Sequence, residues 1–149
     1  MRRIVVSVLF ALLCVPALAV REKSYTVLSP DETIGITLAV GERCTYEVRV
    51  DGRPVVAPTS VSMTLGDGTV WGGSAQPFRI RKGTVDTSFA TPFYIKARVS
   101  DRYNWLRADF RPGFAIELRA YDDGVAYRFV SMTDKPLTVA SEEAGACFP

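Results

Sequence analysis

Neighbouring carboxylates are the residues of this chain best suited to do chemistry. Asp122-Asp123 is the most suggestive pair, because two adjacent carboxylates can bind calcium or act as an acid and a base. Asp31-Glu32 and Glu142-Glu143 form two further pairs, and Asp67 stands between two glycines. The chain has no histidine, which excludes Ser-His-Asp and Cys-His nucleophiles and removes the commonest ligand of catalytic zinc. Any catalysis by this chain would therefore rely on carboxylates.

The sequence around these acids favours turns over a catalytic site. Asp122-Asp123 comes directly before Gly124 and between two expected strands, where Asp is common because its side chain bonds to the turn backbone. Consecutive residues of an extended chain also point in opposite directions. We expect Asp67 and Asp31-Glu32 in solvated turns and Glu142-Glu143 in an exposed C-terminal segment. We therefore assign no catalytic, cofactor-binding or metal-binding residue.

A group of aromatic and polar residues suggests a second kind of chemistry. Tyr103, Asn104, Trp105 and Arg107 could form a sugar-binding surface, in which rings pack against sugar C–H faces and polar groups bind hydroxyls. Alternation places Tyr103, Trp105 and Arg107 on one side of a strand and Asn104 on the other. The alternative is that the rings help to cover a hydrophobic core, which is the commoner role of aromatic residues in strands.

The elements that would position these residues are β-strands. Apolar and polar residues alternate from Thr33 onward, and no segment has the periodicity of a helix. The alternation predicts strands over residues 34–40, 44–50, 59–65, 93–99, 105–110, 114–120 and 125–130. Turn dipeptides such as Asp51-Gly52 and Pro112-Gly113 separate them. This pattern predicts an all-β fold, an antiparallel β-sandwich or barrel.

Residues 70–92 interrupt this alternation. They contain Gly72-Gly73, Pro77, Gly83 and Pro92, which are typical of loops and turns. We expect an irregular region there, with one short strand near Phe78 to Arg81.

The N-terminus reads as a secretory signal peptide over residues 1–19. Arg2 and Arg3 precede an uncharged apolar run over residues 4–13, and Pro16 and Ala17-Leu18-Ala19 complete the pattern of a cleavage site. The run is shorter than the roughly 20 apolar residues that span a bilayer. We therefore expect an exported protein, periplasmic or secreted, and one domain over residues 20–149. The alternatives are a buried N-terminal element and a lipoprotein anchored through Cys14.

Signal cleavage changes the charge and the cysteine content. The chain has 18 basic and 16 acidic residues, and removal of Arg2 and Arg3 leaves 16 of each. A neutral mature chain gives no reason to expect nucleic acid or a membrane surface as a partner. Cys44 and Cys147 remain, and an oxidising compartment permits a disulfide between them. The sequence leaves open whether they pair.

Several segments resemble the N-terminal domain of glycoside hydrolase family 97. Residues 119–129 are similar to the arginine–aromatic–acid–glycine hairpin of that domain, and Arg102-Tyr103-Asn104 resembles its tyrosine-asparagine segment. Ser29-Pro30-Asp31, Tyr46 and residues 52–56 resemble its opening. Trp105 departs from the pattern, because many members have an acid there. Within the hairpin, Arg119 and Arg128 are expected to pair with carboxylates in a structural role.

The resemblance implies part of a large β-sandwich of the galactose-mutarotase type, followed in the family by a (β/α)8 barrel and a small β domain. Family members cleave α-glucosidic or α-galactosidic bonds, with catalytic carboxylates from the barrel. They typically hold calcium at the active site. We do not assign Glu142 or Glu143 of this chain as a calcium ligand. We expect no such barrel within these 149 residues. We therefore expect a non-catalytic, carbohydrate-associated N-terminal domain, apparently truncated, without hydrolase activity or cofactor of its own. The alternatives are a stand-alone carbohydrate-binding module and a non-functional remnant of a disrupted gene.

Overall fold

The computed structural model describes residues 22–74, 76–92, 98–111 and 113–149. The predicted signal peptide lies outside the described residues, as does most of the strand predicted over residues 93–99. Within the described ranges, no helix is long and apolar enough to cross a membrane.

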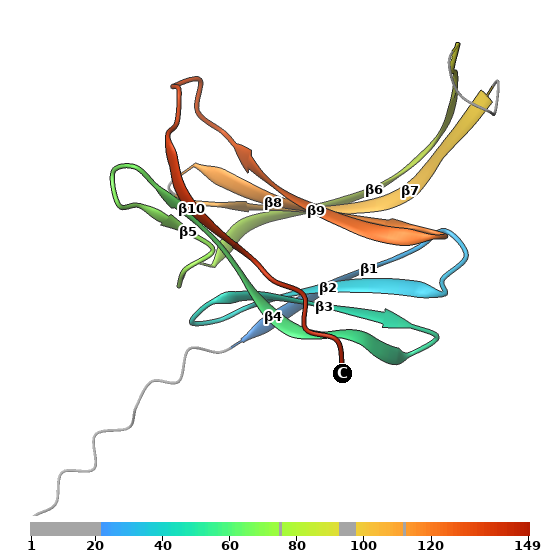
Figure 1. Ribbon diagram of the computed structural model, residues 1–149, viewed down its shortest axis with the longest axis horizontal. Helices are drawn as coiled ribbons and strands as arrows, with labels where there is room; N and C mark the ends of the chain where they lie inside the picture. The colour runs from blue at the N-terminus through green and yellow to red at the C-terminus, as the bar shows by residue number, and fades with distance from the viewer. Residues whose placement is uncertain (1–21, 75, 93–97, 112) are drawn as a thin grey trace, which may run out of the picture.

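The described residues form two antiparallel sheets that pack face to face (Figure 1). The first sheet contains, in spatial order, β1 (Lys23–Leu28), β2 (Ile34–Val40), β3 (Cys44–Val50), β4 (Arg53–Leu65) and β10 (Val139–Ala144), with β5 (Val70–Trp71) also paired to β4. The second sheet contains β6 (Pro77–Ala90), β7 (Arg98–Phe110), β8 (Phe114–Tyr121) and β9 (Gly124–Ser131). The all-β sandwich is confirmed.

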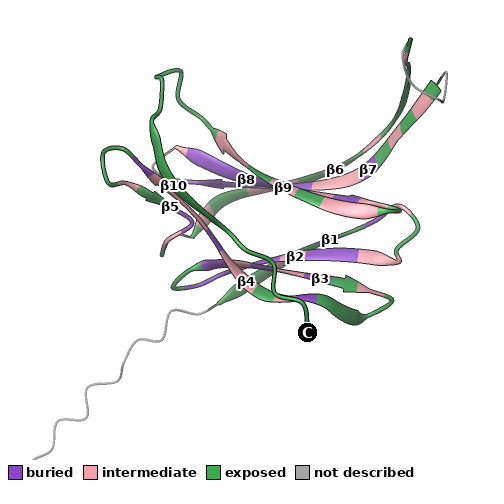
Figure 2. Cartoon of the chain, in the orientation of Figure 1, coloured by how far each residue is buried: buried purple, intermediate pink, exposed green. Residues whose placement is uncertain are grey.

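Strands of both sheets carry buried residues (Figure 2), and their side chains form the hydrophobic core between the sheets. Alternation along each strand turns one set of side chains inward, as the sequence predicts. The first sheet contributes Ile36, Leu38 and Val40 from β2 and Cys44, Tyr46 and Val48 from β3. The second sheet contributes Leu106, Ala108 and Phe110 from β7 and Phe114, Ile116, Leu118 and Ala120 from β8. Both sheets therefore depend on the same buried layer.

The expectation of an irregular region over residues 70–92 is wrong. A single strand, β6, runs from Pro77 to Ala90 and pairs with β7 along its whole length. The sequence of β6 does not alternate regularly between apolar and polar residues, because β6 is an edge strand and both of its faces carry polar and exposed residues. The hairpin of β6 and β7 also extends beyond the first sheet, which leaves its distal part without an apolar layer to face (Figure 1).

The sequence analysis also failed to predict the two-residue strand β5 and two longer strands, β1 and β10. Both lie at edges of the first sheet, and every residue of β10 is exposed. An exposed edge strand is held mainly by backbone hydrogen bonds. It therefore needs no alternating apolar side chains by which the sequence could reveal it. β10 places Glu142 and Glu143 beside β4, where Ser62 Oγ donates a hydrogen bond to Glu143 Oε2 (3.1 Å).

The two cysteines of the described chain are both free thiols. Cys44 is fully buried in the core, whereas Cys147 is exposed and pairs with Ala57 in an isolated bridge. Burial raises the pKa of the Cys44 thiol to about 11, which keeps it protonated and unreactive at neutral pH.

Gly72 is the position at which a side chain is least tolerated. It has φ of +87°, and a Cβ there would lie 2.3 Å from the Val61 carbonyl oxygen. We expect Gly72→Ala to lower the free energy of unfolding by at least about 2 kcal/mol, measured by urea denaturation. Gly52→Ala is the control, because Gly52 has φ of +76° with no atom within 4 Å of a built Cβ. It should lose only about 1 kcal/mol, and equal losses in the two variants would contradict the steric explanation.

Candidate functional site

Strand β7 carries the aromatic residues that the sequence singled out. Tyr103 and Trp105 lie on its outward face, opposite Leu106 and the core, as the alternation predicted. Tyr103 is buried there because the Tyr121 ring lies 4.9 Å away and the Arg119 guanidinium lies 4.7 Å above its own ring. Neighbours on the outer surface therefore cover the Tyr103 ring, and neither Tyr103 nor Trp105 belongs to the core between the sheets.

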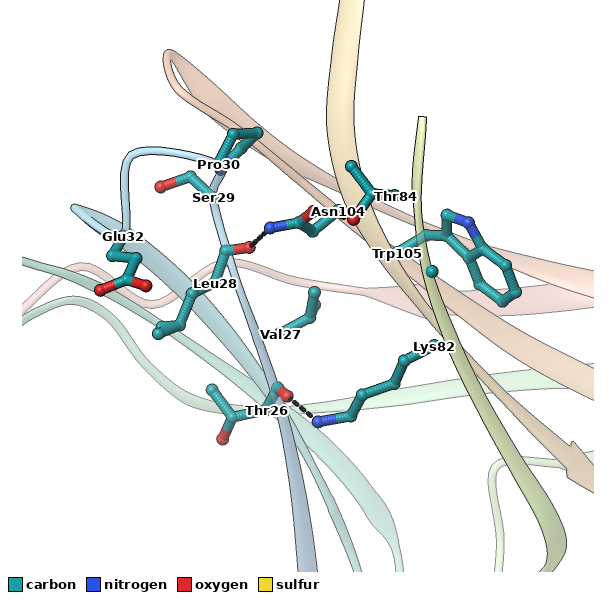
Figure 3. A pocket seen from close by; sticks show the side chains of 11 residues that line it. Thr26, Val27, Leu28, Ser29, Pro30, Glu32, Lys82, Thr84, Asn104 and Trp105 are labelled. Atoms are coloured by element: carbon teal, nitrogen blue, oxygen red, sulfur yellow. Dashed lines mark hydrogen bonds between the residues drawn. The ribbon is translucent and has the colours of Figure 1, made fainter. Parts of the chain in front are cut away.

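Asn104 points to the other side of β7, toward the edge of the first sheet. Its Nδ2 donates to the Leu28 carbonyl oxygen (2.9 Å), and its Oδ1 accepts from Thr84 Oγ1 (2.7 Å) (Figure 3). On β6, Lys82 Nζ donates to the Thr26 carbonyl oxygen (2.7 Å). Two side chains of the second sheet thus satisfy backbone acceptors of β1, which is an edge strand of the first sheet.

These contacts cross a cleft of 460 Å³ between β1 and β6 (Figure 3). The amide of Asn104 and the ammonium of Lys82 bind the protein backbone there, as the dashed lines show. These two side chains of the cleft are therefore already engaged in holding the sheets together.

The outward face of β6 to β9 carries a network of arginines and carboxylates. We call this surface the arginine face. It consists of Arg79, Arg81, Tyr103, Trp105, Arg107, Asp109, Glu117, Arg119 and Arg128. The register places these residues on one face of four neighbouring strands, although they are up to 49 positions apart in the sequence.

Each carboxylate of the arginine face binds two arginines. Asp109 accepts from Arg107 Nε (2.8 Å) and from Arg81 Nη2 (3.0 Å). Glu117 accepts from Nε and Nη2 of Arg119 (3.0 and 2.8 Å) and from Nη2 of Arg128 (3.0 and 3.1 Å). The side chains of Asp109 and Glu117 are only 4% and 11% exposed, so the guanidinium groups cover them.

Both carboxylates stay ionised at neutral pH. Burial raises the pKa of Asp109, but the hydrogen bond from Arg107 and the charges of Arg81 and Arg107 outweigh burial and hold that pKa below its usual value. Burial likewise raises the pKa of Glu117, and the hydrogen bonds from Arg119 and Arg128 outweigh it. The expected pairing of Arg119 and Arg128 with a carboxylate is confirmed, and Glu117 is that carboxylate.

Sequence reasoning missed the carboxylates and Arg81. A signal was present, because Arg107 and Asp109, and likewise Glu117 and Arg119, are opposite charges two residues apart and so share a strand face. Arg81 gave no such signal, because neither residue two positions away, Arg79 or Gly83, carries a negative charge.

Asp31-Glu32, Asp67 and Asp122-Asp123 lie in turns, as expected, whereas Glu142-Glu143 lies exposed in strand β10. Asp67 accepts a hydrogen bond from the Thr69 backbone nitrogen (2.9 Å), and Asp122-Asp123 forms the two-residue turn between β8 and β9. Within residues 22–74, 76–92, 98–111 and 113–149, no three His, Cys, Asp or Glu side chains gather into a possible metal site. We assign no calcium ligand among these residues.

Three segments that carry the family resemblance meet at one corner of the sandwich. The backbone nitrogen of Asp31 donates to Asp122 Oδ1 (2.9 Å), and Arg102 Nη1 lies 3.9 Å from Asp122 Oδ2. Asp31 Oδ1 in turn accepts from Ser29 Oγ (2.5 Å) and from the backbone nitrogen and Oγ1 of Thr33 (3.1 and 2.8 Å). Asp31 and Asp122 thus join the turn after β1 to the hairpin of β8 and β9.

The Asp31 carboxylate should make stability depend on pH. Hydrogen bonds from Ser29 and Thr33 lower its pKa from 3.8 to about 2. Its contribution is therefore present above pH 3.8 and is lost as pH falls toward 2. We expect Asp31→Asn to lower the melting temperature near neutral pH and to match the unchanged protein near pH 2. Asp123→Asn is the control. If the melting temperature of Asp31→Asn stays as far below that of the unchanged protein near pH 2 as near neutral pH, the role of the Asp31 charge is contradicted.

Comparison with known proteins places this geometry in a family. A sequence model described as glycosyl-hydrolase 97 N-terminal matches residues 27–149. A retaining α-galactosidase of Bacteroides thetaiotaomicron is 38% identical over 141 residues, which cover 95% of this chain and 21% of that protein.

Solved structures share the fold. A family 97 glycoside hydrolase variant in complex with panose, from Pseudoalteromonas sp. strain K8, aligns with a TM-score of 0.71 at 18% identity over 80% of this chain and 20% of that chain. A β-arabinopyranosidase aligns with a TM-score of 0.75 at 21% identity over 84% of this chain and 21% of that chain. This chain spans about a fifth of the length of these relatives. Because the family match extends over nearly all the described residues, this chain belongs to the family of glycosyl-hydrolase 97 N-terminal domains.

Proposed function

We propose that this chain acts as a non-catalytic domain of an exported α-glycosidase and packs on a separate catalytic barrel. The observation that carries the proposal is the match over residues 27–149 to a family described as N-terminal, together with the fifth of the relatives' length that the chain spans. One relative is a retaining α-galactosidase, and another family 97 enzyme is in complex with panose. These relatives support an α-glucoside or α-galactoside as the substrate of the whole enzyme.

The described carboxylates support a non-catalytic role. Retaining hydrolysis needs two carboxyl groups about 5 Å apart across a substrate cleft, one as nucleophile and one as acid. Asp109 and Glu117 are each held by two arginines, which stabilise the ionised form and oppose the protonation that a general acid requires. The calcium that the family resemblance implies is proposed to be held by residues outside those described here.

A carbohydrate-binding module is the second candidate, and one observation favours it. Trp105 is partly exposed on the outward face, beside Arg107, and an indole with a neighbouring polar group can bind a sugar. In that case calorimetry with panose should show saturable binding that Trp105→Ala abolishes. A docking domain predicts no such heat. We favour the docking domain because Tyr103, the other ring of this face, is covered by Arg119 and Tyr121.

The purified chain should not hydrolyse aryl α-glucosides or aryl α-galactosides, with or without added calcium. The physical reason is that the two buried carboxylates, Asp109 and Glu117, are each held in the ionised form by two arginines and cannot serve as a general acid. The measurement is release of the aryl group over time, with the retaining α-galactosidase of Bacteroides thetaiotaomicron as the positive control. Turnover by the chain above the rate of a buffer blank would overturn the non-catalytic assignment.

A further inference from the structure

The arginine face concentrates positive charge on one side of a domain whose total charge is balanced. It contains five arginines and two carboxylates, a surplus of three positive charges, whereas the chain without Arg2 and Arg3 has equal numbers of basic and acidic residues. Lysine is absent from this set. Because Asp109 and Glu117 lie beneath the guanidinium groups, the outer layer that a partner would meet is predominantly cationic.

The guanidinium groups of this face are held in place before any partner arrives. Arg81 and Arg107 share Asp109, Arg119 and Arg128 share Glu117, and Arg119 also stacks on the Tyr103 ring. A guanidinium has five donors, and the bonds to the buried carboxylates use only some of them. Fixing a long side chain in advance removes much of the entropy cost that binding would otherwise carry. The free donors are therefore preorganised to bind further carboxylates.

The shape and composition of the face favour a protein over a small ligand. The depression among its side chains has a volume of 260 Å³, below the range of about 300–1,000 Å³ that is usual for ligand pockets. Arginine, tyrosine and tryptophan are the residues most enriched where protein interfaces gain their affinity. A broad sheet face with these residues suits a second protein surface better than an enclosed sugar.

We propose that the arginine face docks a protein surface that presents clustered aspartate and glutamate side chains. Arginine binds carboxylates through paired N–H donors, which gives the contact both strength and a defined orientation. The charge surplus would also accelerate association with an acidic partner. The inference goes beyond the proposed function, because it identifies the docking face and its chemistry whichever polypeptide carries the carboxylates.

The test is a titration of the 149-residue chain with a hexaglutamate peptide at low salt, followed by NMR. The indole N–H resonance of Trp105 reports on the arginine face, whereas that of Trp71 reports on the core. We expect saturable binding that shifts the Trp105 resonance and leaves Trp71 unchanged. A hexalysine peptide should produce no shift.

Two double variants distinguish binding at the arginine face from general attraction between opposite net charges. Arg79→Gln with Arg128→Gln removes two exposed charges but leaves Asp109 and Glu117 each bound by arginine. Arg49→Gln with Arg53→Gln removes two equally exposed charges from the first sheet. The first variant should weaken hexaglutamate affinity at least about fivefold, and the second less than about twofold. Melting temperatures verify that both variants fold.

Three results would overturn the proposal. The first is no saturable binding of hexaglutamate to the unchanged chain. The second is an equal loss of affinity in both double variants, which would reduce the effect to net charge. The third is tighter binding of an oligogalacturonate than of hexaglutamate, which would make the face a site for an acidic glycan. None of these results depends on hydrolytic activity, so they are independent of the test of the proposed function.

Discussion

In a two-layer sandwich each strand can bury only one of its two faces, and this constraint decides where the charges of the domain lie. β7 and β8 face the core with residues such as Leu106, Ile116 and Leu118, so the residues that alternate with these must point away from it. Asp109 and Glu117 are nevertheless buried, because arginines from β6 to β9 cover them. The apolar residues of β7 and β8 that pack in the core turn the alternate residues outward, and the two carboxylates then hold the arginines of the arginine face in place.

The sequence predicted the strands that the core constrains and missed those that it does not. β2, β3, β8 and β9 were recognisable because burial of one face forces a period of two. In β6 both faces are largely exposed, and Gly83 suggested a loop although it lies within the strand against the Trp105 ring. The pairing of Asp31 with Asp122 was also beyond prediction, because 91 positions separate the two residues and only the fold brings them together.

The proposed docking role depends on which surfaces of the domain have side chains free to bind a partner. The cleft between β1 and β6 is crossed by Asn104 and Lys82, whose hydrogen bonds satisfy the edge of β1 and limit strand addition there. Turn geometry accounts for Asp67 and Asp122. The arginine face is left as a broad surface with preorganised donors, which is consistent with a domain whose contribution to a larger enzyme is contact with another surface.

The central claim is that a buried carboxylate organises the arginines of this face. The most direct measurement compares Glu117→Gln with Glu47→Gln, whose partner Arg49 lies on the exposed face of the first sheet. Urea denaturation of Glu117→Gln should show a loss of about 1–3 kcal/mol, because Arg119 and Arg128 lose a shared buried counter-charge. Glu47→Gln should lose less than about 1 kcal/mol, as for exposed ion pairs. Equal, small losses in both variants would contradict the claim.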